Sequence, residues 1–387
     1  IEIPLGGYFM KFTIKRDLLM AAVQNVMKAI SSRAVIPILS GMKIEASIHG
    51  IKLTGSDSDI SIESFIPSEE NGNVNVENIE PGSIVLQAKY FPDIVRKLPQ
   101  DTVEFIVDDN HQVQISSGKA EFTLVGQSAE EYPHLPRIEA DQSFEMPIPL
   151  IKNMIKQTVF AVSTMETRPI LTGVNMHLEN NVLNFTATDS HRLAMRKTTI
   201  EATEVEFHNV VVPGKSLNEL SKILDDAEET VEISVTNNQI LFRTKHLSFL
   251  SRLLDGNYPE TSRLIPEEKK TSITVNTKEL LNTIDRASLL AREERNNVVK
   301  LTTEGNSVVE ITSNSPEVGN VHEEIVVESV EGEDLKISFS SKYMMDALKS
   351  IEYDEITIDF TGAMRPFVLV PKEDDSILQL ILPVRTY

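Results

Sequence analysis

Two stretches of the chain, ILSGMKIEASIHGIKLTGSDSDISI at residues 38–62 and ILTGVNMHLENNVLNFTATDSHRLAM at residues 170–195, are versions of one pattern. Both open on Ile-Leu-Ser/Thr-Gly, and in both the Asp of an Asp-Ser pair follows that glycine by 16 positions. A third, weaker version is NNVVKLTTEGNSVVEITSNSP at residues 296–316. Matching segments at fixed spacing indicate one structural unit used several times.

The segments that follow these stretches repeat as well. They are VLQAKYFPDIVRKL (85–98), VVVPGKSLNELSKIL (210–224) and ISFSSKYMMDALKSI (337–351). Units of this spacing fill the chain three times, and we expect three domains at residues 10–139, 140–267 and 268–387. Residues 1–9 precede a Met-Lys-Phe-Thr start and are expected to be a leader or extension outside the fold.

Each unit has the pattern strand, helix, several strands, helix, several strands. Apolar residues at helical spacing alternate with period-2 segments such as VEISVTNNQILFRT, where Asn237-Asn238 predicts a hairpin turn. The pattern is typical of the α+β class, with antiparallel sheets. The predicted helices cover residues 15–30, 88–98, 149–162, 214–224, 277–291 and 341–351.

Composition excludes several functions. The chain of 387 residues contains no Cys, so disulfides and Cys-ligated metals are absent, and its eight His are scattered. Phosphate-binding loops, dinucleotide fingerprints and His-Glu-x-x-His motifs are missing, and no apolar run is long enough to span a membrane. We therefore expect no metal and no cofactor. The net charge of −21 by itself predicts a protein that avoids nucleic acid.

The basic residues, however, are segregated. Five of the six predicted helices carry net positive charge and the sixth carries none, although the chain is strongly acidic. Two basic columns recur in all three units, seven positions apart and hence on one helix face. A shared surface that contacts phosphates without reading sequence explains this recurrence, whereas ordinary solvated lysines do not. The columns are Lys89, Lys215 and Lys342, and Arg96, Lys222 and Lys349.

Asp189, Ser190 and His191 are the residue types of a hydrolytic triad. Neighbours in a chain cannot point at one another as triad members do, and Ser190 has no Gly-x-Ser-x-Gly context. The alternative is a turn in which Asp and Ser side chains bond to nearby backbone N–H groups. We expect the turn and no catalytic residue.

Several motifs resemble the bacterial DNA polymerase III beta subunit, the sliding clamp, in the order of that family. They are IPIL (36–39), RPILTG (168–173), TDSHRLA (188–194), YPE followed by R and IP (258–266) and LPVR (382–385). The resemblance implies three clamp-fold domains per chain and a homodimeric ring, with helices lining the hole and sheets outside. It implies a cytoplasmic, non-enzymatic processivity factor on double-stranded DNA.

Helix geometry favours the dimer independently. Helices pack roughly 10 Å apart, so six in a circle give a ring about 19 Å across between axes and twelve give about 38 Å. After side chains are allowed for, only the larger ring leaves the roughly 20 Å that duplex DNA needs.

The resemblance also assigns residues. Arg33 matches a loop arginine that contacts DNA. A cleft for partner peptides would receive residues from the second and third domains, and the family usually has Gly where this chain has Ser190. The cleft residues are Arg168, Leu171, Thr188, Ser190, His191, Arg192, Leu193, Pro259, Arg263, Leu264, Ser340, Tyr343, Leu382, Pro383, Val384 and Arg385. Phe122, Leu289 and Leu290 match the dimer interface.

The partners implied are the clamp loader, the replicative polymerase, repair polymerases, ligase and mismatch-repair proteins. Two other functions stay open on the residues alone. A hydrolase would lose turnover on substitution of Ser190. A repeat-built scaffold or adhesion protein would be insensitive to charge reversal in the basic columns.

Overall fold

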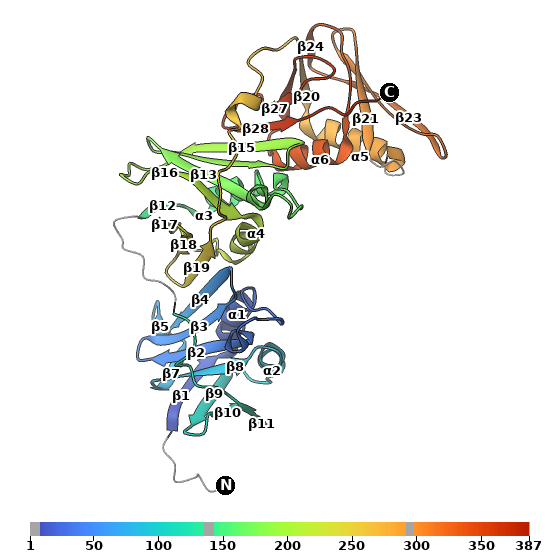
Figure 1. The fold of residues 1–387 in the computed structure, drawn as a ribbon. Coiled ribbons are helices and arrows are strands. Elements are labelled where there is room, and N and C mark those ends of the chain that lie inside the picture. Colours follow the sequence, from blue (N-terminus) through green and yellow to red (C-terminus); the bar gives the residue numbers. More distant parts are fainter. Residues whose placement is uncertain (1–7, 135–142, 292–296, 387) are drawn as a thin grey trace. The chain divides into compact units, whose positions relative to one another are not determined.

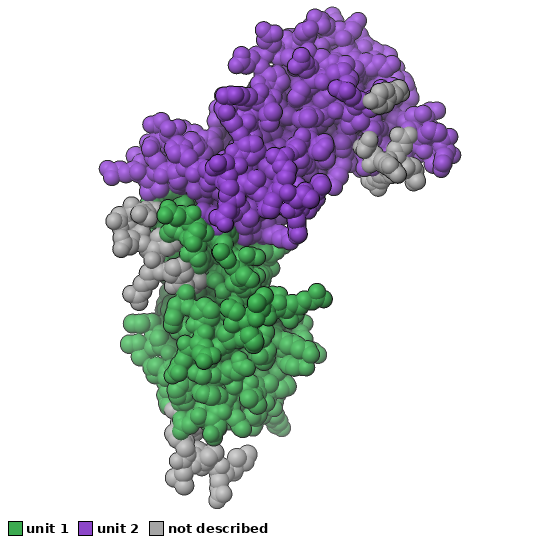
Figure 2. Space-filling view, viewed as in Figure 1, with its two compact units in different colours: residues 1–148, 219–252 green, residues 149–218, 253–387 purple. Residues whose placement is uncertain are grey.

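The computed structural model describes residues 8–134, 143–291 and 297–386 (Figure 1). These residues belong to two compact units, coloured green and purple in Figure 2. Unit 1 contains residues 1–148 and 219–252, and unit 2 contains residues 149–218 and 253–387. The second sequence repeat therefore contributes to both units. The expected domain boundary at 139/140 lies outside the described residues.

Unit 1 contains a five-stranded and an eight-stranded antiparallel sheet. The first has the order β11 (Ala120–Val125), β10 (Gln112–Ser117), β9 (Thr102–Asp108), β1 (Tyr8–Lys15) and β7 (Val76–Glu80). The second has the order β12 (Ser143–Pro147), β17 (Thr230–Val235), β18 (Gln239–Arg243), β19 (Leu247–Arg252), β4 (Ile60–Pro67), β3 (Gly50–Ser56), β2 (Gly41–Ser47) and β8 (Gly82–Gln87). A short ribbon pairs β5 (Glu69–Glu70) with β6 (Asn73–Val74).

Unit 2 contains a nine-stranded and a four-stranded antiparallel sheet. The larger has the order β16 (Phe207–Pro213), β13 (Gly173–Glu179), β14 (Val182–Thr188), β15 (Arg192–Thr199), β28 (Ile377–Ile381), β27 (Phe367–Pro371), β26 (Glu355–Phe360), β20 (Thr271–Asn276) and β24 (Ser329–Gly332). The smaller has the order β23 (Gly319–Val326), β22 (Val308–Ser315), β21 (Val298–Glu304) and β25 (Lys336–Ser340).

The two large sheets each join strands of different repeats. In unit 1, β4 of the first repeat pairs with β19, the last strand of the second repeat. In unit 2, β15 pairs with β28, the last strand of the third repeat. β4, β15 and β23 occupy the same place in their repeats, and so do β11, β19 and β28. One type of strand junction therefore occurs twice within the chain.

Within the described residues, all six expected helices are present. They are α1 (Arg16–Met27), α2 (Phe91–Lys97), α3 (Ile148–Lys156), α4 (Gly214–Ile223), α5 (Thr277–Ala291) and α6 (Ser341–Ser350). The expected helix at 149–162 ends at Lys156, where the Thr158 hydroxyl donates to the Met154 carbonyl (2.7 Å). The hairpin predicted at Asn237-Asn238 lies between β17 and β18, as expected.

The helix expected at 15–30 ends at Met27, and two further expected boundaries were wrong. α2 begins at Phe91, not at residue 88, because Pro92 lacks an N–H and fits only the first turn of a helix. Lys89 therefore lies in the turn before α2 and does not share a helix face with Arg96. β1 begins at Tyr8, where it pairs with Asp108, so Tyr8 and Phe9 belong to a strand and not to a leader.

Helical spacing of apolar side chains explains the packing. In α5, Leu280, Ile284 and Ala287 are buried and share a core with Val309 and Ile311 of β22. The side chains of β22 alternate between this core and the opposite sheet face, as the period-2 pattern predicts. The apolar stripe of α5 thus covers one face of the four-stranded sheet.

Candidate functional site

The triplet Asp189-Ser190-His191 forms the turn between β14 and β15. The Asp189 carboxylate accepts hydrogen bonds from the backbone N–H groups of His191 (2.9 Å) and Arg192 (3.1 Å). Ser190 has φ of 78°, in the left-handed region that side chains seldom adopt. The carboxylate is occupied by the backbone and by Arg192, so the turn interpretation is confirmed and no proton relay through His191 is formed.

Arg192 lies behind this turn and is 8% exposed. Its guanidinium bonds to Asp189 (3.1 Å), to Asp346 of α6 (2.7 Å) and to the carbonyl of Phe160 (2.9 Å). It also stacks on the Tyr343 ring at 4.5 Å. Every guanidinium nitrogen therefore has a partner, and Arg192 positions the turn against α6 instead of facing solvent.

An apolar floor lies beside the turn. Leu193, Val368 and Leu380 form a buried cluster, and the partly buried Ile265 and Leu382 pack against it. The backbone N–H of Leu382 donates to the carbonyl of His191 (3.0 Å), which attaches the C-terminal segment to the turn. Strand pairing between β15 and β28 thus brings residues from two repeats into one surface of unit 2.

A second buried cluster supports the other side of the turn. It contains Leu171, Val211 and Tyr258. The Tyr258 hydroxyl accepts from the backbone N–H of Thr188 (2.9 Å), and the Thr188 hydroxyl donates to the carbonyl of Arg192 (2.6 Å). Burial raises the pKa of Tyr258 well above its ordinary value, so this phenol stays neutral and keeps its hydrogen bond at every physiological pH.

Charged side chains border this surface. Arg168 is exposed and donates to the Ser190 hydroxyl (3.2 Å). Arg263 pairs with Glu260 (3.3 Å), and Leu264 beside it is 47% exposed. The His191 and Tyr343 rings lie 6.4 Å apart, and burial followed by the charge of Asp189 raises the pKa of Tyr343.

The structure divides the sixteen expected cleft residues by exposure. Arg168, Ser190, His191, Pro259, Arg263, Leu264 and Arg385 are exposed. Tyr343, Leu382, Pro383 and Val384 are half-buried, and Leu171, Thr188, Arg192, Leu193 and Ser340 are buried. Ser340 caps α6, where its hydroxyl accepts from the N–H of Tyr343 (3.3 Å). The buried residues shape the surface and the others can contact a ligand.

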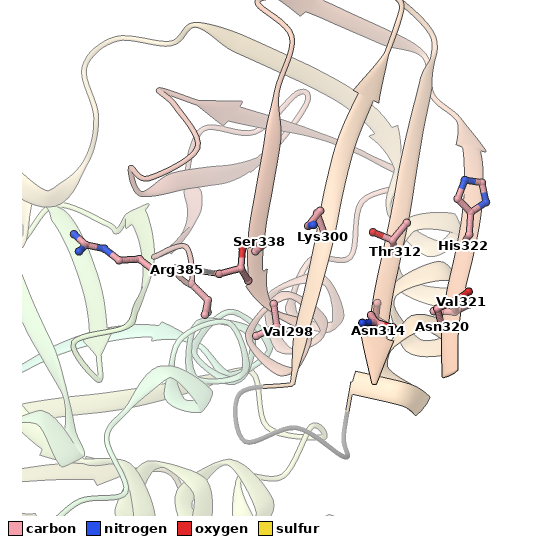
Figure 3. A pocket seen from close by; sticks show the side chains of 12 residues that line it. Val298, Lys300, Thr312, Asn314, Asn320, Val321, His322, Ser338 and Arg385 are labelled. Atoms are coloured by element: carbon pink, nitrogen blue, oxygen red, sulfur yellow. Dashed lines mark hydrogen bonds between the residues drawn. The ribbon is translucent and has the colours of Figure 1, made fainter. Parts of the chain in front are cut away.

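The C-terminal segment also forms one wall of a pocket of about 650 Å³ on the third repeat (Figure 3). Val384 donates its N–H to the carbonyl of Ser338 (2.8 Å). Lys300, Thr312 and His322 form a row across β21, β22 and β23 in the pocket. In Figure 3, Arg385 extends away from these strands. Sequence reasoning missed this row, whose signal was the polar face of alternating strands.

All six residues of the basic columns are exposed, as is Arg33 in the loop before β2. Arg96 pairs with Asp93 (2.9 Å) and Lys222 pairs with Glu219 (2.8 Å), each on its own helix. Lys89 lies over the Tyr90 ring at 5.0 Å. Exposed ion pairs of this kind contribute little to stability.

The expected dimer residues lie on β11 and α5. Phe122 is 38% exposed and Leu289 is 60% exposed, whereas Leu290 is partly buried. In the part of the chain that the structure describes, no cluster of His, Asp and Glu could hold a metal ion. Every described helix is too short or too polar to cross a lipid bilayer.

Three joined copies of one α+β unit, exposed basic helices and a non-catalytic turn beside an apolar floor define a DNA-clamp protein. Sequence models of the DNA polymerase III beta subunit match its N-terminal domain at residues 10–136, its central domain at 145–260 and its C-terminal domain at 262–385. The chain belongs to the DNA polymerase III beta subunit family. The family resemblance and the expected fold are thereby confirmed.

Relatives in this family are named beta sliding clamps. That of Bacillus subtilis (strain 168) is 60% identical over 378 residues, covering 98% of this chain and 100% of the relative. That of Halalkalibacterium halodurans is 54% identical over 380 residues, with the same coverage of both. A sliding clamp is a non-catalytic processivity factor, and this is the class to which the chain belongs.

Solved structures agree over almost the whole chain. The B. subtilis DNA polymerase sliding clamp superimposes with a TM-score of 0.95, covering 98% of this chain and 100% of that one at 60% identity. The beta chain of Streptococcus pneumoniae gives 0.92 at 45% identity, covering 97% and 100%. The Pseudomonas aeruginosa clamp bound to griselimycin gives 0.90 at 25% identity, covering 98% and 100%.

Proposed function

We propose that two copies of this chain close head to tail into a ring around duplex DNA. The observation that carries the proposal is the repeated strand junction. β4 pairs with β19 and β15 pairs with β28, whereas their equivalents β23 and β11 each end a sheet. A second copy supplies the partner that each of these two edges lacks, and closure covers both.

Apolar side chains at both edges support this pairing. On β11, Phe122 is 38% and Val125 is 78% exposed, and on β23 Val326 is 72% exposed. Leu289 of α5 is 60% exposed, and α5 packs beside β22 and β23. Edge strands that stay in solvent usually carry charge, so these residues favour an interface.

The exposed basic helix residues are proposed to face the DNA. The acidic remainder of the chain repels phosphate, and the helices offer loose, sequence-independent contacts. Weak contacts suffice because a closed ring is retained by topology, and weakness permits sliding. The proposed contacts are Arg33, Lys89, Arg96, Lys215, Lys222, Lys342 and Lys349.

The surface beside the β14–β15 turn is proposed to bind partner peptides. Leu193 and Leu382 offer an apolar floor, while Arg168 and Arg385 are exposed cations. An extended peptide with apolar and polar or acidic side chains fits this chemistry. We propose that it tethers the replicative polymerase, and in turn the clamp loader, repair polymerases, ligase and mismatch-repair proteins, in the cytoplasm.

The repeats at 10–139, 140–267 and 268–387 are proposed as the three domains of the chain.

The test is retention on DNA. The protein is loaded with a clamp loader and ATP onto nicked circular DNA, transferred to high salt, and separated from free protein by gel filtration. It is expected to stay on the circle and to leave when one restriction cut linearises the DNA. Electrostatic binding falls steeply with salt, so release from the intact circle, together with a monomer by light scattering, would contradict the ring.

A further inference from the structure

The scaffold beneath the proposed peptide cleft of unit 2 occurs a second time, in unit 1. Short 3-10 helices Pro37–Ser40 and Pro169–Thr172 precede β2 and β13. The N–H of Leu39 donates to the carbonyl of Ile36 (3.0 Å), as the N–H of Leu171 does to that of Arg168 (3.1 Å). The same hydrogen bond therefore opens the 3-10 helix of both scaffolds.

The β3–β4 turn likewise matches the β14–β15 turn. The Asp57 carboxylate accepts from the backbone N–H groups of Asp59 (2.7 Å) and Ile60 (2.8 Å). Asp189 makes the same two bonds in unit 2. β4 then pairs with β19, just as β15 pairs with β28.

Each unit also contains a buried apolar cluster with a tyrosine whose hydroxyl bonds to the backbone. The Tyr132 hydroxyl donates to the carbonyls of Gly41 (3.3 Å) and Thr54 (3.2 Å), and the Tyr258 hydroxyl accepts from the N–H of Thr188 (2.9 Å). Burial raises the pKa of both tyrosines well above the ordinary value. The clusters are Leu39, Val85, Ala129 and Tyr132 in unit 1 and Leu171, Val211 and Tyr258 in unit 2. The 3-10 helix, the Asp-capped turn and the buried tyrosine cluster of unit 2 thus recur, whereas the contacts of Arg192 do not, because Ile60 stands in its place.

An open pocket of about 480 Å³ lies on the copy in unit 1. Val35, Ile36, Leu39 and Pro133 are among its apolar lining residues, and Asp57 and Asp59 are its acidic ones. Val35 is 90% and Ile36 is 52% exposed, an uncommon placement for two neighbouring large apolar side chains. A smaller pocket of about 140 Å³ shares the turn and the proline.

The two sites differ in charge. Ile36 stands where unit 2 has Arg168, Asp59 stands where it has His191, and Ile60 stands where it has Arg192. The positive charges near the unit 1 site come from Arg33 and Arg252, which line the larger and the smaller pocket. Two carboxylates on the turn disfavour an acidic peptide and favour a basic one.

We propose that this pocket is a second docking site, for an extended partner peptide that carries large apolar side chains flanked by Lys or Arg. The apolar side chains fill the wall of Val35 and Ile36, and the basic flank pairs with Asp57 and Asp59. This inference rests on the proposed function, because it assumes that the corresponding surface of unit 2 binds peptides. Two sites of opposite preference let one chain hold two different partners at once.

The experiment uses the whole chain with labelled Ile, Leu and Val methyl groups. Two tetrapeptides with blocked ends, Lys-Leu-Phe-Lys and Asp-Leu-Phe-Asp, are titrated while methyl spectra are recorded. The basic peptide is expected to shift the methyl signals of Val35, Ile36 and Leu39. The acidic peptide is expected to shift those of Leu193 and Leu382.

The affinity of the basic peptide for substituted chains then shows which site it occupies. Val35→Glu with Ile36→Glu is expected to weaken the basic peptide roughly tenfold, because an apolar anchor is lost. Ile48→Glu is the matched control, since Ile48 is 71% exposed on the same unit and lies outside the pocket. That control, and Arg168→Glu in unit 2, are expected to leave the basic peptide unaffected.

The proposal is overturned if the basic peptide shifts no methyl signal near Ile36, or if the double variant binds it as tightly as the unchanged chain does. The proposal is also overturned if Arg168→Glu abolishes binding of the basic peptide while the double variant does not. That result would place the basic peptide in the unit 2 cleft. Failure of the acidic peptide to shift Leu382 contradicts that cleft, while the basic peptide still decides the second site.

Discussion

Arg192 is the residue on which the proposed cleft depends most. The sequence identified it as a cleft residue, but nothing in the sequence indicated that Asp346, on a helix of another repeat, would bind its guanidinium. That contact arises from the pairing of β15 with β28, which joins segments far apart in the chain. Sequence reasoning therefore named the residue for the cleft but could not predict its buried contacts.

Replacing Arg192 with Ala is expected to lower the free energy of unfolding by about 2–4 kcal/mol, because it leaves two partly buried carboxylates without their partner. Arg192→Lys keeps the charge but loses the planar fork and is expected to recover only part of this loss. Denaturant unfolding of both variants measures the effect. Exposed Arg168→Ala serves as the control, with an expected change below about 0.5 kcal/mol.

Ser190 combines a side chain with a left-handed backbone conformation, φ 78°. Ser190→Gly and Ser190→Ala both remove the hydroxyl that accepts from Arg168, but only glycine removes the steric conflict at Cβ. We expect the glycine variant to be more stable than the alanine variant by about 1 kcal/mol in denaturant unfolding. Equal stabilities would show that the turn is not strained.

The helices and the order of helices and strands along the chain could be predicted, because apolar periodicity depends only on residues close in sequence. The start of α2 was misplaced since the alignment of Lys89 with Lys215 and Lys342 outweighed the signal of Pro92. The pairing of β4 with β19 and of β15 with β28 could not be predicted, because periodicity gives no information on which distant edges meet. The cleft depends on these pairings, so its residues could be named only by resemblance.

The strands β2 and β3 carry an ion-pair cluster in which Glu45 contacts Lys43 (3.1 Å) and Lys52 (3.2 Å). Burial by itself raises the pKa of Glu45, but the hydrogen bond from Lys43 and the charge of Lys52 outweigh it, and the pKa lies below its ordinary value of 4.5. The ionised form therefore stabilises the folded state above pH 4.5, and this stabilisation is lost as the pH falls through the lowered pKa.

Glu45→Gln is accordingly expected to be less stable than the unchanged chain at neutral pH, by an amount that shrinks on acidification below pH 4.5. Urea unfolding at a series of pH values from neutral to acid measures the difference. A difference that grows as the pH falls would contradict the assignment.

The unpaired edges β11 and β23 lead to a prediction about assembly. Phe122→Glu places a charge in the proposed interface and is expected to raise the dimer dissociation constant at least about tenfold, without lowering the unfolding midpoint. Sedimentation equilibrium measures the constant. Ile48→Glu makes the same change on an exposed residue away from the edge and should leave the dimer intact.

At the scale of the whole molecule, the charge of −21 and the basic helices describe a protein that meets DNA without binding it tightly. Composition alone predicted avoidance of nucleic acid, and only the recurrence of basic columns over three repeats indicated otherwise. Each lysine in such a surface contributes little to the affinity for DNA. We therefore expect it to change the rate of encounter with DNA and not the retention of the loaded ring.

Lys342→Glu is therefore expected to slow loading onto circular DNA several-fold and to leave the half-life of the loaded ring in high salt unchanged. Loading rates and salt-challenged retention on the same plasmid separate the two effects. Lys336→Glu, on the exposed side of β25, reverses the same charge outside the basic columns and should alter neither. Loss of retention in Lys342→Glu would mean that electrostatics and not topology hold the protein.

The pairing of β15 with β28 has a consequence for biosynthesis. β28 comprises residues 377–381 and is synthesised long after β15 at residues 192–199. Until residues 377–381 emerge from the ribosome, Arg192, the apolar floor and the edge of β15 lack the strand that covers them. The second repeat has been synthesised long before. The nascent chain must therefore wait with an exposed edge strand, and a chain truncated before β28 keeps that edge permanently. Synthesis of β28 thus completes the proposed partner-binding surface.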